Sequence, residues 1–229
     1  IGLLGIYAGW QMGPDGPTTH PSEITRMGDW IEFLAERQRD GYERRIDLVR
    51  GTGFDGVMVS TAWKAGGTSA ALANVWTDDA ADAITRHGYA GGGTRLSDYW
   101  PQLYIGPVNN TSMLTDPGTG IFDKSDLQVA GKPYMMSEWS SSPPNQQKLE
   151  AVPMFGFYGM GLYGWDISTH FHGGNGWFGG GWPSWGIWAG HTPHHLGQFL
   201  AISRAVREGH IQEGEPAAAL HFTEDDAFS

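Results

Sequence analysis

Apolar and polar positions along the chain form blocks that predict short buried strands separated by helices and loops. Residues 29–50 place apolar side chains at helical spacing below a charged outer face, and Asp29 and Glu32 form a capping pair, so this block predicts a long helix. Four short apolar runs without a two-residue period predict buried strands, at residues 56–60, 80–87, 132–139 and 161–166. Further helices are predicted over residues 145–160 and 193–209, and loops over residues 1–28, 91–128 and 171–197.

Strands of this kind are typical of a parallel α/β sheet that is buried on both faces. Polar and aromatic residues follow the strands at their carboxyl ends, where active sites of parallel α/β proteins lie. We therefore expect an α/β fold with a functional site at this edge. Four consecutive strands are half the number in a (β/α)8 TIM barrel.

Composition narrows the classes of function. Among 229 residues the chain has 25 acidic and 14 basic ones and a formal net charge of −11, which argues against a nucleic-acid or anionic-membrane partner. The absence of cysteine excludes disulfides and thiolate chemistry. No apolar run is long enough to span a membrane.

The first residues do not form an intact signal peptide. Ile1 opens an apolar run over residues 1–7 that lacks both a basic region and a small-residue cleavage site. We therefore expect a chain that was processed or that belongs to a longer protein.

Glu138 is the strongest candidate for catalysis, because it ends an apolar strand and is followed by Trp139 and three serines. A carboxylate in this place can attack an anomeric carbon and form a glycosyl-enzyme intermediate. The position also fits a helix-capping or ion-paired glutamate, and the sequence leaves both interpretations open.

His87 and Tyr89 follow another predicted strand and lie two residues apart, so both can point to the same rim. A tyrosine hydroxyl can orient a carboxylate and a histidine can bind a sugar hydroxyl. Trp165 ends the last predicted strand and could stack on a sugar ring, although a single tryptophan more often packs in a core.

Five of the 11 tryptophans lie between residues 165 and 188, within a segment rich in glycine. Such a loop cannot bury five indoles easily, so we expect some of them, Trp177 included, to line an open carbohydrate site.

The order of these motifs resembles the C-terminal half of a clan A retaining glycoside hydrolase, closest to agarase-like and β-galactosidase-like members. Residues 132–139 resemble the seventh barrel strand, whose terminal glutamate is the nucleophile, here Glu138. The segment His87-Gly88-Tyr89 resembles the end of strand six, and residues 161–166 resemble strand eight with its active-site tryptophan. The resemblance implies a half barrel supplying strands five to eight over residues 1–215, with residues 216–229 as a tail or the start of a β-domain.

The resemblance implies an O-glycosidic hydrolase of poly- or oligosaccharides that works by retaining double displacement, with Glu138, Tyr89 and His87 as catalytic residues. The expected substrate-binding residues are Trp63, Trp139, Asn145, Trp165, Asp166, His170 and Trp177. No Asn-Glu pair, which carries the acid/base in this clan, occurs in the chain, so we expect that residue upstream of Ile1. The fragment alone would then be inactive.

The expected ligand is a carbohydrate, with no cofactor, no metal, no nucleic acid and no membrane. A half barrel exposes sheet edges and would pair with its missing N-terminal half or with a second copy of the chain. We expect an extracellular or periplasmic location.

Two alternatives remain open at this point. A non-catalytic carbohydrate-binding protein accounts for the tryptophans and the missing acid, but it predicts a β-sandwich. A metalloenzyme accounts for two groups of histidines, which comprise His170, His172, His191, His194 and His195.

Overall fold

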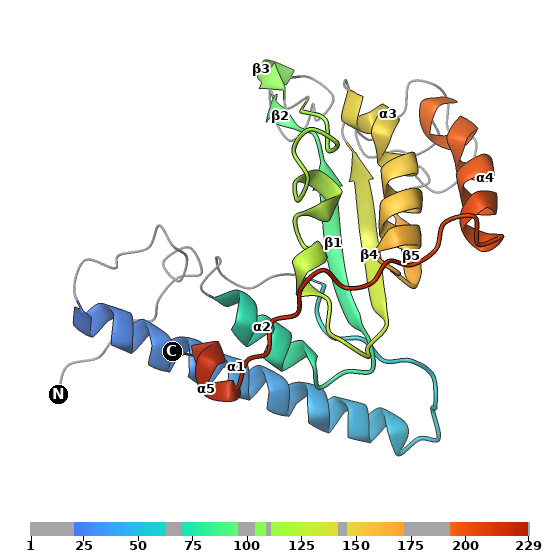
Figure 1. The fold of residues 1–229 in the computed structure, drawn as a ribbon. Coiled ribbons are helices and arrows are strands. Elements are labelled where there is room, and N and C mark those ends of the chain that lie inside the picture. The colour runs from blue at the N-terminus through green and yellow to red at the C-terminus, as the bar shows by residue number, and fades with distance from the viewer. Residues whose placement is uncertain are drawn as a thin grey trace. The chain divides into compact units, whose positions relative to one another are not determined.

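The computed structural model describes most of the chain as helices, strands and connecting turns (Figure 1). The described residues are 21–62, 70–95, 104–108, 111–141, 146–171 and 193–228. The chain divides into two compact units. The first consists of Ile1–Thr85, Val129–Lys132 and Pro216–Ser229, and the second of Arg86–Gln128 and Pro133–Glu215.

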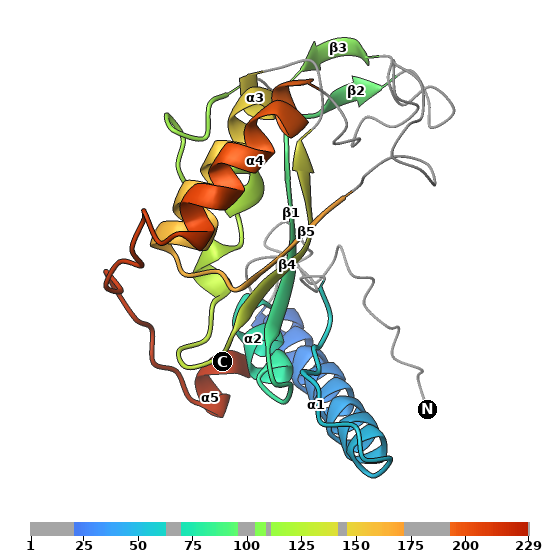
Figure 2. The ribbon, with the colours of Figure 1, turned by 90° about the vertical axis from the view of Figure 1, so that its right-hand side faces the viewer.

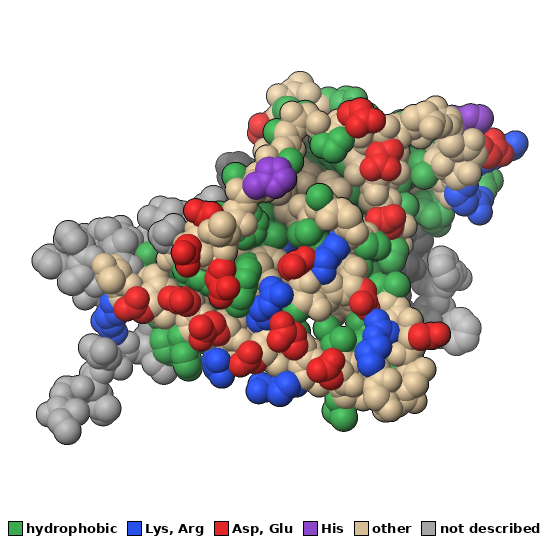
Figure 3. Space-filling model, turned by 60° about the horizontal axis from the view of Figure 1, so that its bottom comes forward, with side chains coloured by type: hydrophobic (Ala, Val, Ile, Leu, Met, Phe, Trp, Pro, Cys, Tyr) green, Lys and Arg blue, Asp and Glu red, His purple; other side chains and the backbone are tan. Residues whose placement is uncertain are grey.

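The described residues of the first unit form three helices, which are α1 (Pro21–Arg50), α2 (Ala71–Asp78) and α5 (Glu224–Phe228). The helix predicted over residues 29–50 is confirmed, and α1 begins eight residues earlier. Ion pairs one turn apart support its exposed face, including Arg39 with Glu43 at 3.1 Å. On the face that Figure 3 shows, acidic and basic side chains lie among one another.

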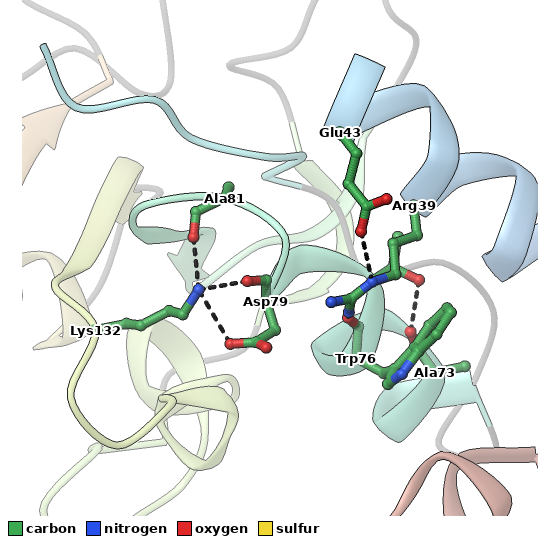
Figure 4. Close-up of polar contacts among 8 residues, drawn as sticks. Arg39, Glu43, Ala73, Trp76, Asp79, Ala81 and Lys132 are labelled. Atoms are coloured by element: carbon green, nitrogen blue, oxygen red, sulfur yellow. Dashed lines mark hydrogen bonds and ion pairs between the residues drawn. The ribbon is translucent and has the colours of Figure 1, made fainter. Parts of the chain in front are cut away.

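Two cations of the first unit contact α2 and the residues that follow it (Figure 4). The Lys132 ammonium donates to the backbone carbonyls of Asp79 and Ala81 and lies 3.1 Å from the Asp79 carboxylate. The Arg39 guanidinium donates to the carbonyl of Trp76 and lies 4.6 Å from the centre of its ring. Arg39 therefore satisfies a carbonyl in the last turn of α2, and Lys132 satisfies two carbonyls just after this helix.

A three-stranded parallel sheet forms the centre of the second unit, with strand order β1-β4-β5. These strands are β1 (Ile84–Ala90), β4 (Tyr134–Ser141) and β5 (Ile167–His170). A separate antiparallel pair consists of β2 (Gly93–Arg95) and β3 (Tyr104–Val108), and two short 3₁₀ turns follow, η3 (Gly120–Phe122) and η4 (Ser125–Leu127).

Helices pack on one face of this sheet, where α3 (Gln146–Pro153) and α4 (Pro193–Arg207) lie side by side (Figures 1 and 2). The helix α3 continues without interruption into a π-helix, η5 (Met154–Leu162). Pro153 lacks a backbone N–H, so the ordinary helical hydrogen-bond ladder cannot pass through it unchanged. We attribute the wider π geometry that follows to this residue.

An aromatic core fills the space between the sheet and these helices. Trp165 lies 5.3 to 5.5 Å from the rings of Phe122, Tyr134 and Phe155, and Phe155 stacks on Trp139 with centroids 4.0 Å apart. A side chain at Gly159 would bring its Cβ within 2.5 Å of the Trp165 ring, so glycine is needed there for the helix to approach.

The predicted half TIM barrel is wrong. The central sheet of the described residues is open and has three strands, so this unit is a small α/β domain. Residues 56–60 contribute a single parallel bridge, from Val59 to Ala83, rather than a full strand. Residues 161–166 form the end of the π-helix and a turn, because an apolar glycine-rich run fits a buried helix as well as a buried strand.

No helix in the described part of the chain combines the length and the hydropathy that crossing a membrane requires.

Candidate functional site

Glu138 lies in β4, and two side chains from β1 lie against it. The hydroxyl of Tyr89 donates a hydrogen bond to Oε2 of Glu138, and Nδ1 of His87 lies 3.3 Å from the same oxygen. The Glu138 side chain is 33% exposed, so the carboxylate is accessible while it is held. The structure therefore brings together the three residues that the sequence analysis names as catalytic candidates.

The geometry of β1 explains why both partners reach the carboxylate. His87 and Tyr89 are alternate residues of the strand, so their side chains project from the same face of the sheet. Between them, the Cα of Gly88 faces the opposite side, where an added Cβ would lie 2.4 Å from Cε of Met136. Glycine therefore allows the backbone of β1 to approach the core at this point.

Aromatic rings shield the tyrosine. The rings of His87 and Phe171 meet Tyr89 edge-on, with centroids 6.4 and 6.3 Å from it. This burial is the largest cause that raises the pKa of Tyr89, and the hydrogen bond and negative charge of Glu138 raise that pKa further. The phenol therefore remains protonated, and able to donate, across the physiological pH range.

His87 is neutral at neutral pH for a related reason. Burial lowers its pKa, the carboxylate of Glu138 partly opposes this effect, and the charge of Lys124 adds to it. A neutral imidazole beside Glu138 leaves the negative charge of the carboxylate uncancelled.

Trp139 points away from Glu138 and into the aromatic core. Its side chain is 1% exposed, stacks on Phe155 and donates from Nε1 to Oγ of Ser168 over 2.9 Å. The ring of His195 is stacked on it with centroids 5.6 Å apart. The structure therefore gives this indole a packing role, because it is buried and stacked against two other rings.

Trp165 is also in the core, with 2% exposure, and its Nε1 donates to Oε1 of Gln128 over 3.3 Å. Its aromatic neighbours leave no face of the ring open to a sugar. Trp165 therefore packs in the core, which was the second of the two interpretations that the sequence allowed.

Asp166 does not join Glu138, because it precedes β5 rather than ending a strand. Its carboxylate accepts the backbone N–H of Tyr134 over 2.8 Å, and its own N–H donates to the Tyr134 carbonyl over 2.9 Å. These bonds fasten it to the first residue of β4, four positions before Glu138. The strand was predicted to end at residue 166, but β5 begins at Ile167. Asp166 therefore lies at the amino end of the sheet and not at its carboxyl end.

His170 ends β5 beside the core. Its ring lies 5.0 Å from that of Trp139 and 4.2 Å from that of the buried His195. Among the residues that the structure describes, no group of three or more histidine, aspartate or glutamate side chains has the arrangement of a metal site. The side chains of His172, His191 and His194 lie outside the described set.

Three predicted substrate-binding residues, Trp63, Asn145 and Trp177, also lie outside the described residues. The structure adds two residues that the sequence did not indicate. Phe171 packs against Tyr89, and the charge of Lys124 lowers the pKa of His87. The strand that ends at His170 could have indicated Phe171 had its boundary been placed correctly. No pattern in the sequence marks Lys124, which lies in a turn.

Comparisons with known proteins give no relative for this site: no family model, no curated protein and no solved structure matches the chain. The functional argument therefore depends on the chemistry of the residues themselves.

Proposed function

We propose that this chain is a glycoside hydrolase that forms a covalent glycosyl-enzyme intermediate on Glu138. The observation that carries the proposal is the pair of contacts from Tyr89 and His87 to a single oxygen of a partly exposed carboxylate. An ion-paired or capping glutamate would instead meet a cation or backbone N–H groups. An oriented carboxylate beside a permanently protonated phenol is suited to nucleophilic attack.

The two oxygens of the Glu138 carboxylate differ in their contacts with Tyr89 and His87. Both fall on Oε2, so among the described residues Oε1 is the oxygen that remains for attack. In the first step Oε1 forms a bond to the anomeric carbon while the bond from this carbon to the leaving oxygen breaks. Water then attacks the same carbon, the ester bond to Glu138 breaks, and the anomeric configuration is retained overall.

Protonation of the leaving oxygen needs a second carboxyl group, which stands about 5–5.5 Å from the nucleophile in retaining enzymes. A dinitrophenolate leaves as a stable anion and does not need this proton. Dinitrophenyl glycosides therefore test the nucleophile by itself, whatever residue supplies the acid.

The substrate class in this proposal is a poly- or oligosaccharide, with an extracellular or periplasmic location. It draws on the resemblance of the strand motifs to retaining glycoside hydrolases and on the number of tryptophans in the chain, 11 in 229 residues. It does not require a barrel, because function depends on the site rather than on the fold.

The test measures dinitrophenolate release from a panel of dinitrophenyl glycosides. We expect a burst of about one equivalent of dinitrophenolate per chain with at least one sugar. Glu138→Ala should abolish the burst, and added azide should restore release by attacking the anomeric carbon from the vacated side. Glu208→Ala, a change at an exposed glutamate after α4, is the matched control and should keep the burst. An undiminished burst in Glu138→Ala would refute the proposal.

A further inference from the structure

An irregularity in β4 determines the side of the sheet on which Glu138 emerges. The side chains of Tyr134 and Met136 are buried, and strict alternation would place residue 138 on their side as well. Instead Glu138 reaches His87 and Tyr89, and Trp139 is buried.

The pairing of β4 with β5 locates the irregularity. Met136 pairs with Ser168 and Trp139 pairs with His170, so three steps along β4 correspond to two steps along β5. One extra residue is therefore inserted in β4 between Met136 and Trp139, which is the definition of a β-bulge.

Packing confirms this insertion independently of the pairing. Tyr134 and Trp139 are five positions apart, so a regular strand would place them on opposite faces. Both belong to the same aromatic core, since Tyr134 contacts Trp165, Trp165 contacts Phe155, and Phe155 stacks on Trp139. The bulge thus returns Trp139 to the core and turns Glu138 to the opposite face.

Trp139 holds this arrangement from the core side. Its indole stacks with the rings of Phe155 and His195, and its Nε1 donates to Oγ of Ser168. Ser168 is the residue opposite Met136, at the start of the bulge. Trp139 lies just after the extra residue, and Ser168 pairs with Met136 just before it. The hydrogen bond from Trp139 to Ser168 therefore connects the two sides of the bulge through β5.

We propose that Trp139 and Ser168 are positioning residues that lock the β4 bulge and thereby aim Glu138 at Tyr89. They act through the backbone of β4 and do not touch the substrate. This inference rests on the proposed function for its catalytic consequence, whereas the position of Glu138 beside Tyr89 can be measured without any substrate.

The first readout is the titration of Tyr89, followed by NMR of protein labelled with ¹³C at the tyrosine Cζ and assigned with Tyr89→Phe. In the unchanged protein this phenol should titrate well above the ordinary value of about 10. In Ser168→Ala and Trp139→Phe its pKa should be lower than in the unchanged protein, because the hydrogen bond and charge of Glu138 no longer raise it, and it should stay above the ordinary value because the phenol remains buried. Ser168→Thr keeps a hydroxyl and should restore the raised pKa.

The second readout is the rate of the dinitrophenolate burst, which we expect to fall about tenfold or more in Ser168→Ala. Ser125→Ala is the matched control, since it removes a 2.8 Å hydrogen bond to the carbonyl of Phe122 away from the bulge. It should change neither readout.

The inference is overturned if Ser168→Ala, folded by circular dichroism, has the same Tyr89 pKa as the unchanged protein, whatever its stability. Should Trp139→Phe fail to fold, Ser168→Ala and Ser168→Thr decide by themselves. If the unchanged protein gives no burst with any sugar, the proposed function fails while the Tyr89 titration still tests the positioning.

Discussion

The two oxygens of Glu138 have different surroundings, and the side chains of Tyr89 and His87 produce that difference. A hydrogen bond to a charged group is worth about 1.5–3 kcal/mol. If the bond from Tyr89 orients the carboxylate for attack, its loss should appear in the rate of the first chemical step rather than in the fold.

Tyr89→Phe should therefore slow the dinitrophenolate burst by about 10- to 100-fold, which corresponds to the energy of such a bond. Stopped-flow absorbance measures this rate directly. Tyr158→Phe, at a partly exposed tyrosine of the π-helix, is the control and should leave the rate unchanged. An equal rate in Tyr89→Phe and the control would remove the tyrosine from the mechanism.

His87 predicts a pH dependence of stability. Its pKa in the folded protein is lowered, chiefly by burial, so the unfolded chain binds its proton more readily than the folded one. The stabilisation from neutral His87 is therefore complete above the unfolded pKa of about 6.5 and decreases as pH falls below it toward the folded pKa.

Urea denaturation of the unchanged protein and of His87→Asn at pH 5 and pH 7.5 measures this effect. The free energy of unfolding should decrease less between the two pH values in the variant, because the titrating group is absent. An identical decrease in both proteins would show that His87 does not contribute.

At the scale of elements, β1 and β4 bring the candidate site together, and Gly88 permits their arrangement. A Cβ at this position would lie 2.4 Å from Cε of Met136 and 2.7 Å from the carbonyl oxygen of Ile121. Since the second contact is backbone, the added methyl group cannot be accommodated by a rotamer change alone.

Gly88→Ala should lower the free energy of unfolding by about 1–3 kcal/mol, the usual cost of overpacking a core. The same substitution at Gly197, in α4 with no atom within 4 Å of an added Cβ, should raise stability by about 0.5–1 kcal/mol. Chemical denaturation compares the two variants. Effects of the same sign would contradict the packing described here.

The elements that carry the site were predictable in part from the sequence. Short apolar runs that end in polar residues predicted the strands of His87, Tyr89 and Glu138, because buried strands favour such runs. The end of η5 and the turn after it were predicted as a strand, since Gly161 and its neighbours form an apolar run too short to show a period. Because of this error, Asp166 was expected at the carboxyl end of the sheet, whereas it lies at the amino end.

The bulge in β4 was not predictable, because its cause lies outside the strand. The residues from Met136 to Trp139 carry no glycine or proline that marks an irregularity. It is the aromatic core, through Phe155 and His195, that draws the indole of Trp139 inward. Contacts between distant segments therefore decided which way Glu138 faces.

At the scale of the whole molecule, the described helices and parallel strands differ from the β-sandwich that a non-catalytic carbohydrate-binding module predicted. The helix α1 alone has 30 residues, and α4 adds 15. Far-UV circular dichroism should therefore show the double minimum of α-helix. A single minimum typical of β-sheet would contradict the architecture and favour the sandwich.

The central claim is that Glu138 becomes covalently bonded to a sugar, and the most direct measurement is the mass of the trapped intermediate. Dinitrophenyl 2-deoxy-2-fluoroglycosides react without an acid catalyst, and their fluorine slows the second step so that the ester accumulates. Mass spectrometry of the protein and its peptides should show one fluorosugar per chain, located on Glu138. A label on another residue, or no label with any sugar of the panel, would contradict the account.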